Sequence, residues 1–163
     1  MNRKWKIALG VLTAIIVFCL WYTRPRNFDD LVGSGEFQNF SMLATVAWTS
    51  DGKAGSDTWQ LDSYEGREET AGMLKNILQS CQYRVSLRSL LPLPNPGPIY
   101  GEGNITISFM VVTGVEEGFG AICCGTAVEF THGGRTFLTQ VQDPDITEKI
   151  LALAQEYGWK TDS

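Results

Sequence analysis

The sequence has little with which to build a catalytic or metal site. Its 163 residues include a single histidine, His132, and four cysteines. No pair of cysteines has the spacing of a zinc site, and the Gly-x-Ser-x-Gly pattern around a nucleophilic serine is absent. His132 precedes Gly133 and Gly134, a sequence typical of an exposed hairpin turn. These absences predict a protein without catalytic activity, metal or cofactor.

Positive charge is also scarce outside the N-terminal region. Five basic residues flank an apolar run there, which leaves eight of the 13 basic residues against all 18 acidic ones, a net charge near −10. Because nucleic-acid affinity depends on Lys and Arg that neutralise phosphates, this balance excludes nucleic acid as a partner. The simplest interpretation of the acidity is solubility.

The run Ile7–Tyr22 contains no charged residue. A helix over this run, extended to Trp5, would span about 27 Å, close to the ~30 Å core of a bilayer. Trp5, Trp21 and Tyr22 are placed like interfacial aromatic anchors. The pattern predicts one uncleaved membrane-spanning helix through residues 7–22, which acts as a signal anchor.

Three alternatives apply to this segment. A cleaved signal peptide needs small residues before the cut, whereas this run ends in bulky side chains. A lipoprotein would have a small residue before its acylated cysteine, whereas Phe18 precedes Cys19. A buried core helix is disfavoured because the run has no polar face and stands at the start of the sequence.

The flanking charges predict an orientation. Arg3, Lys4 and Lys6 precede the run, and Arg24 and Arg26 follow it. This excess of one basic residue favours a cytoplasmic N-terminus. We therefore expect a single-pass protein of the cell membrane with an extracytoplasmic domain.

The chain divides into three parts on this interpretation. Residues 1–22 form the membrane anchor. Residues 23–35 contain Pro25 and a Gly-Ser-Gly stretch, which is typical of a tether. Residues 36–163 have the size of one domain.

Periodicity within the domain predicts six strands and two helices. Strands follow from alternation of apolar and polar residues, and helices from apolar residues three and four apart. The order is strands 42–49 and 58–62, a helix over 66–82, strands 84–89, 105–111, 119–131 and 135–142, and a helix that opens at Asp143-Pro144. Hairpin-linked strands and one-faced helices predict an α+β fold, a mainly antiparallel sheet with two helices on one face, in the order β-β-α-β-β-β-β-α.

Two cysteines could meet in this fold. Cys81 lies on the apolar stripe of the first helix of the domain. In a continuous strand over 119–131, Cys124 shares a face with Ile122 and Val128, and Cys123 points the other way. If that face meets the helix, Cys81 and Cys124 could form a disulfide outside the cytoplasm. The alternative is that both are buried thiols.

The segment 90–103 holds four prolines. Proline disfavours both a helix and a central strand, so this segment is predicted to be a loop. Its apolar side chains Leu93, Ile99 and Tyr100 are candidate contacts with a partner. The alternative is a stiff surface connector.

Four segments carry a resemblance. They are the basic and apolar start, GREETAGMLKNILQSCQYR, NITISFMVV, and RTFLTQVQDPDITEKILALAQ. This layout resembles small membrane-anchored or lipoprotein-type extracytoplasmic domains of bacteria, many of unknown function. The resemblance covers most of the chain as a pattern of elements. It implies location and fold class, and it brings no site residues.

Three hypotheses about function follow. The first is a membrane-tethered extracytoplasmic binding or interaction domain without catalytic activity, whose partner is an unknown protein or small ligand. The second is an inhibitor or immunity-type protein that neutralises one partner through an acidic surface. The third is an enzyme with an unfamiliar site, for which Asp51, Asp57 and His132 are the candidate residues.

Overall fold

The computed structural model describes residues 3–50, 52–63, 68–90, 105–114 and 117–161. The elements are α1 (Arg3–Tyr22), β1 (Pro25–Asn27), α2 (Asp29–Val32), β2 (Asn39–Ser50), β3 (Lys53–Asp62), α3 (Glu68–Gln79), β4 (Gln82–Val85), the 3-10 turn η1 (Leu87–Leu90), β5 (Ile105–Gly114), β6 (Glu117–Cys124), β7 (Ala127–His132), β8 (Arg135–Val141), α4 (Ile146–Tyr157) and β9 (Trp159–Thr161). The described strands form one antiparallel sheet in the order β1-β4-β8-β7-β6-β5-β2-β3-β9. The predicted α+β class with a mainly antiparallel sheet is confirmed.

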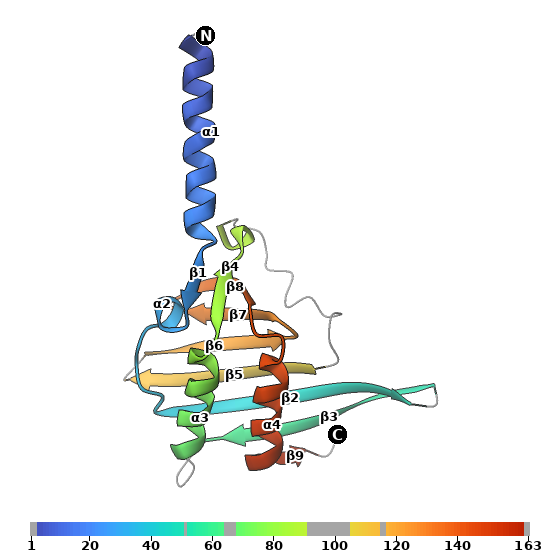
Figure 1. The fold of residues 1–163 in the computed structure, drawn as a ribbon. Coiled ribbons are helices and arrows are strands. Elements are labelled where there is room, and N and C mark those ends of the chain that lie inside the picture. The colour runs from blue at the N-terminus through green and yellow to red at the C-terminus, as the bar shows by residue number, and fades with distance from the viewer. Residues whose placement is uncertain (1–2, 51, 64–67, 91–104, 115–116, 162–163) are drawn as a thin grey trace.

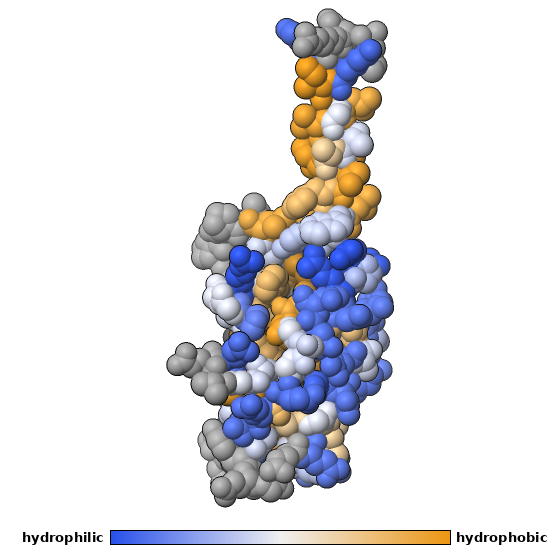
Figure 2. All heavy atoms as spheres, turned by 90° about the vertical axis from the view of Figure 1, so that its left-hand side faces the viewer, coloured by the Kyte–Doolittle hydropathy of each residue, from blue (hydrophilic) through white to orange (hydrophobic). Residues whose placement is uncertain are grey.

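The helix α1 stands clear of the rest of the molecule (Figure 1). Its 20 residues rise about 30 Å at 1.5 Å per residue, the thickness of a bilayer core. The segment Lys4–Tyr22 has a mean hydropathy of 1.9 and is not buried against the domain, so it is long and apolar enough to cross a membrane. Figure 2 shows its apolar surface above a largely hydrophilic domain.

Both long helices of the domain, α3 and α4, lie on one face of the sheet, as predicted (Figure 1). Each is amphipathic. Leu74 and Leu78 on α3 and Ile150 on α4 are fully buried against the sheet. The sheet supplies the other half of this core from alternate residues of its strands, such as Met42 and Ile107.

The segment expected to be a tether is instead part of the folded domain. Its strand β1 pairs with β4, and Phe28 is only 1% exposed. The Phe28 ring lies 5.5 Å from that of Phe119 and 5.8 Å from that of Phe130, centroid to centroid. Gln79 of α3 also donates a hydrogen bond of 2.9 Å to the Asp29 carboxylate. The helix α1 is therefore followed almost at once by core residues.

The segment predicted to be one strand over 119–131 is two strands, β6 and β7. A two-residue turn separates them, and Gly125 in that turn has φ +56°, a left-handed conformation that glycine adopts without strain. Cys124 therefore pairs with Ala127, and Cys123 pairs with Val128. The turn reverses the alternation, so Cys124 and Val128 lie on opposite faces of the sheet.

Candidate functional site

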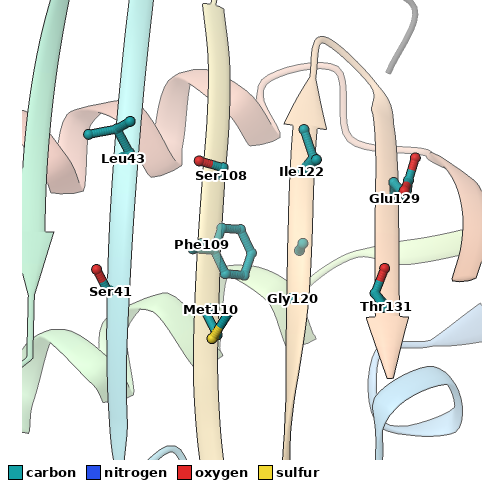
Figure 3. Close-up of a pocket in the computed structure, with 10 residues that line it drawn as sticks. Ser41, Leu43, Ser108, Phe109, Met110, Gly120, Ile122, Glu129 and Thr131 are labelled. Carbon is teal, nitrogen blue, oxygen red and sulfur yellow. The ribbon is translucent and has the colours of Figure 1, made fainter. Parts of the chain in front are cut away.

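The second face of the sheet carries neither α3 nor α4. Its central strands are β2, β5, β6 and β7, which are hydrogen-bonded neighbours. Residues that pair directly across these strands share a face, so the register identifies what the face presents. Two cross-strand rows lie side by side at its centre (Figure 3). The rows are Leu43, Ser108, Ile122 and Glu129, and Ser41, Met110, Gly120 and Thr131. We call this surface the open face.

The open face is hollowed at its centre. A groove of about 460 Å³ is lined by both rows, a volume within the range of small-molecule sites. A second hollow of about 490 Å³ continues along β5 and β6 and shares Met110, Gly120 and Thr131 with the first. We call the first hollow the central groove.

Gly120 forms the floor of the central groove. A Cβ atom built at Gly120 would have no neighbour closer than the Phe109 carbonyl oxygen at 3.9 Å. The fold therefore leaves room for a side chain that the sequence does not provide. Gly118 is different, because its Cβ would lie 2.4 Å from the Val111 carbonyl oxygen. Of these two glycines, Gly118 is the one that strand packing requires.

Apolar side chains stand exposed around this floor. Met110 is 66% exposed and Leu43 is 43% exposed, whereas residues of the other face, such as Met42 and Ile107, are buried beneath α3 and α4. Ile122, on the neighbouring strand β6, is half-buried. Exposed apolar groups that converge on a hollow are typical of binding surfaces.

Glu129 gives the groove a polar end. Its neighbours across the strands are Ile122 on β6 and Leu138 on β8, both aliphatic. The Glu129 Oε2 atom is buried and has no hydrogen-bond partner among the described residues. A buried acceptor without a partner destabilises a fold by about 1–3 kcal/mol, so its presence requires an explanation.

The described lining of the central groove contains one acidic residue, Glu129, and is therefore negative. No lysine or arginine is among its described lining residues. Asp62, which pairs with Ser41 across β2 and β3, lies on the same face. The Asp62 Oδ2 atom accepts a hydrogen bond of 3.0 Å from Gln60, and its Oδ1 atom is buried without a partner among the described residues. The central groove therefore suits a ligand with an apolar part and a positive charge.

A separate cluster on the helix side involves a thiol, but it is unsuited to nucleophilic chemistry. The Cys81 Sγ atom lies 3.8 Å from Asp143 Oδ2, which in turn lies 2.5 Å from Lys149 Nζ. Burial raises the pKa of the Cys81 thiol, although the Ser80 hydroxyl opposes this. Burial also raises the pKa of Cys123 to about 12. Both groups are protonated at neutral pH, whereas a nucleophilic cysteine needs the thiolate.

The predicted disulfide is not formed. All four cysteines are thiols, Cys81 and Cys124 included. Cys81 is buried on the helix side, whereas Cys124 pairs with Thr106 and Ala127 and faces the other way. The prediction was wrong because it treated β6 and β7 as one strand. The turn at Gly125 places Cys124 and Val128 on opposite faces of the sheet.

Of the other predicted site residues, Asp57 and His132 belong to the part of the chain that the structure describes. Leu93, Ile99 and Tyr100 lie outside the described residues, as does Asp51. Asp57 forms a 2.9 Å ion pair with Lys160. His132 places Nδ1 2.9 Å from the Gly118 carbonyl oxygen.

Sequence reasoning missed the central groove. The signal that could have found it is the pair of apolar residues at Met110 and Val112, which fall between the core positions of β5. Among the described residues there is no cluster of three His, Cys, Asp or Glu side chains that could hold a metal ion.

No family model matches the chain, and no curated protein or solved structure matches it significantly. The resemblance to small anchored bacterial domains therefore stays a prediction.

Proposed function

We propose that this chain is a membrane-tethered binding domain without catalytic activity, and that its central groove holds a small amphipathic cation. In this proposal α1 crosses the cell membrane once with its N-terminus in the cytoplasm, and the sheet domain lies outside. The observation that carries the binding role is the buried, unpartnered Oε2 atom of Glu129 at an open apolar groove.

The length and exposure of α1 support the anchor. A 20-residue apolar helix without packing partners in the domain is unfavourable in water, because about 25 cal/mol is lost for each Å² of apolar surface left exposed. A bilayer removes that penalty. The basic residues before Ile7 support the orientation.

The charge distribution of the open face supports the class of ligand. Glu129 and Asp62 each carry a buried carboxylate oxygen without a described partner. An ammonium or guanidinium group would provide the missing hydrogen bond at Glu129, and such a bond is stronger to a charged donor than to a neutral one. Asp62 lies four strand steps from Glu129, about 19 Å away, and adds only to the negative charge of the same face. Met110 and Leu43 would cover the apolar part of the same ligand.

A reporter fused after Ser163 tests the orientation. We expect activity from a reporter that works only outside the cytoplasm. An inactive reporter in an intact, expressed fusion would refute the orientation, and a chain found only in the soluble fraction would refute the anchor.

Binding is tested with the full chain in lipid nanodiscs, using hexylammonium and its neutral counterpart 1-hexanol. We expect shifts of the Gly120 and Thr131 amide resonances, and about 10- to 100-fold tighter binding of the ammonium form, from a charge-assisted hydrogen bond of about 1.5–3 kcal/mol. Equal affinity for the two probes, or shifts confined to other strands, would contradict the proposal.

Two variants and a control sharpen this test. Gly120→Val adds a branched side chain to the floor, where a Cβ atom meets nothing closer than 3.9 Å, and should abolish binding of both probes. Glu129→Gln should remove only the preference for the ammonium form. Thr106→Val changes the same face of β5 outside the groove and should leave both affinities unchanged. If a basic protein co-purifies with the chain and Glu129→Gln does not affect that complex, the inhibitor-type alternative is favoured instead.

A further inference from the structure

The edge of the sheet nearest α1 is held close to the end of that helix. Pro25 follows the last helical residue, Tyr22, by three positions and pairs with Arg84 of β4. Three extended residues reach at most about 10 Å and paired backbones lie about 5 Å apart, so the Arg84 backbone is within about 15 Å of the helix end. Figure 1 shows β4 beside β1, the strand that follows α1.

A hollow lies at this edge. Its volume is about 420 Å³, and its polar lining includes Arg84, Ser86, Arg88 and Gln140. Arg84 pairs with Gln140 across β4 and β8, so both side chains project from the open face. We call this hollow the arginine pocket. It is separate from the central groove and shares no lining residue with it.

The wall of the arginine pocket is fixed by hydrogen bonds between η1 and β8. The Ser86 amide donates to the Leu138 carbonyl at 2.8 Å, and the Leu138 amide donates to Ser89 Oγ at 2.9 Å. The Arg88 amide donates to Ser86 Oγ at 3.3 Å. The backbone that carries Arg88 is therefore ordered before any ligand binds.

Charge in the arginine pocket is opposite to that of the domain. The described lining residues include two arginines and no acid. Neither Arg84 nor Arg88 forms an ion pair with a described residue. Residues 82–90 contain these two basic residues and no acidic one, within a domain whose net charge is near −10.

Two further cations, Arg24 and Arg26, follow the end of α1. The Arg24 guanidinium lies 5.6 Å from the Trp21 ring centroid, and that of Arg26 lies 5.8 Å from it. Tryptophan at the end of a membrane helix lies at the headgroup layer, which is about 5–7 Å thick on each side of the core. The long side chains of Arg84 and Arg88 can reach that layer from the sheet edge.

We propose that the arginine pocket binds the phosphodiester headgroup of an anionic membrane lipid. The inference rests on the proposed insertion of α1 into a bilayer, because that insertion brings the pocket to the headgroups. Arg84 and Arg88 donate to the phosphate oxygens, and Gln140 and Ser86 donate to the same headgroup. A free phosphate has the same chemistry, but the position beside α1 favours the lipid.

The test uses the full chain in mixed vesicles of phosphatidylglycerol and phosphatidylcholine, with native mass spectrometry of the lipid retained by the protein. We expect wild type to be enriched in phosphatidylglycerol. The double variant Arg84→Gln/Arg88→Gln should lose roughly 30-fold of that enrichment, which corresponds to about 1 kcal/mol for each arginine near an anionic surface. Arg135→Gln, on β8 but outside the pocket, should keep it.

Three measurements separate the possible failures. Co-sedimentation with pure phosphatidylcholine vesicles reports insertion of α1 alone, and its absence would overturn both the anchor and this inference. Insertion with no lipid preference, or with a preference that the double variant retains, would overturn this inference only. Displacement of the lipid by millimolar glycerol phosphate would identify a site for soluble phosphates and would also overturn it.

A conservative variant guards against misfolding. Arg84→Lys/Arg88→Lys keeps the charge and should retain most of the enrichment. Its thermal unfolding in phosphatidylcholine vesicles should match that of the glutamine variant. If both variants lose the enrichment equally while folded, positive charge in the pocket is not the cause, and the inference is wrong.

Discussion

Glu129 on β7 lies directly opposite Leu138 on β8, so a carboxylate faces an aliphatic side chain across the strands. Its Oε2 atom is buried without a described partner. The next strand places Ile122 on the other side. Neither neighbour can donate a hydrogen bond to this oxygen from its side chain, and the consequence for stability can be measured.

Glu129→Leu should stabilise the protein. The change removes a buried unpaired acceptor and extends the aliphatic row, so we expect the free energy of unfolding to rise by about 1–3 kcal/mol. Chemical denaturation of the full chain in detergent measures it. Glu129→Gln keeps a polar group at the site and should give a smaller gain. A loss of stability in Glu129→Leu would show that the carboxylate has a structural role.

The two glycines of β6 should respond differently to alanine. Gly118→Ala forces a Cβ against the Val111 carbonyl oxygen and should destabilise the sheet by about 1–3 kcal/mol. Gly120→Ala meets no close atom and should be neutral or stabilising by up to about 1 kcal/mol. Thermal unfolding of the two variants gives the comparison, and equal losses would mean that the groove floor is packed.

Phe28 should be as important to stability as a residue in the middle of the domain. Phe28→Ala removes a ring that is 1% exposed and should lower the free energy of unfolding by about 3–5 kcal/mol. Phe18→Ala is the matched control, because Phe18 on α1 is 47% exposed and should leave unfolding of the domain unchanged. Similar small effects in both variants would restore the interpretation of residues 23–35 as a tether.

Cys123 should make stability fall at alkaline pH. Burial raises its pKa from 9.0 to about 12, so the folded state retains the proton while the unfolded state releases it. Its contribution is fully present below pH 9 and is lost as the pH rises towards 12, by at most about 1.4 kcal/mol per pH unit. Unfolding of wild type and Cys123→Ala across this range should show the difference between them shrink. A constant difference would rule out the buried thiol as its source.

The helices and most strands could be predicted because their signals are local. The apolar stripe that includes Leu74 and Leu78 repeats at helical period, and the alternation through Ile107 and Phe109 repeats at two. These patterns alone are enough to predict which residues of these elements form the core between the helices and the sheet. The short strand β9, which pairs with β3 through Trp159–Thr161, has no such repeat.

The errors arose where a single residue decides the structure. Gly125 reverses the chain without a common hairpin pair such as Asn-Gly. Because of this one turn, Cys124 lies on the face opposite to Val128. Phe28 is buried by contacts with β6 and β7, which are distant in sequence. The central groove requires the pairing of β2 with β5 and the absence of a helix over that face, and neither is visible in a local pattern.

If α1 crosses a bilayer as we propose, its direct connection to the sheet also determines how the domain is oriented on that bilayer. Thr23 continues the helical hydrogen bonding to Cys19. Pro25, the third residue after the helix, already pairs with β4, and Phe28 is buried in the core. Because the connecting segment is short and folded, the domain and α1 are expected to move as one rigid unit. In that arrangement, rotation of α1 about its axis rotates the open face by the same angle and leaves its height above the lipid unchanged. A second helix that packs against α1 within the membrane would therefore fix the direction in which the central groove faces.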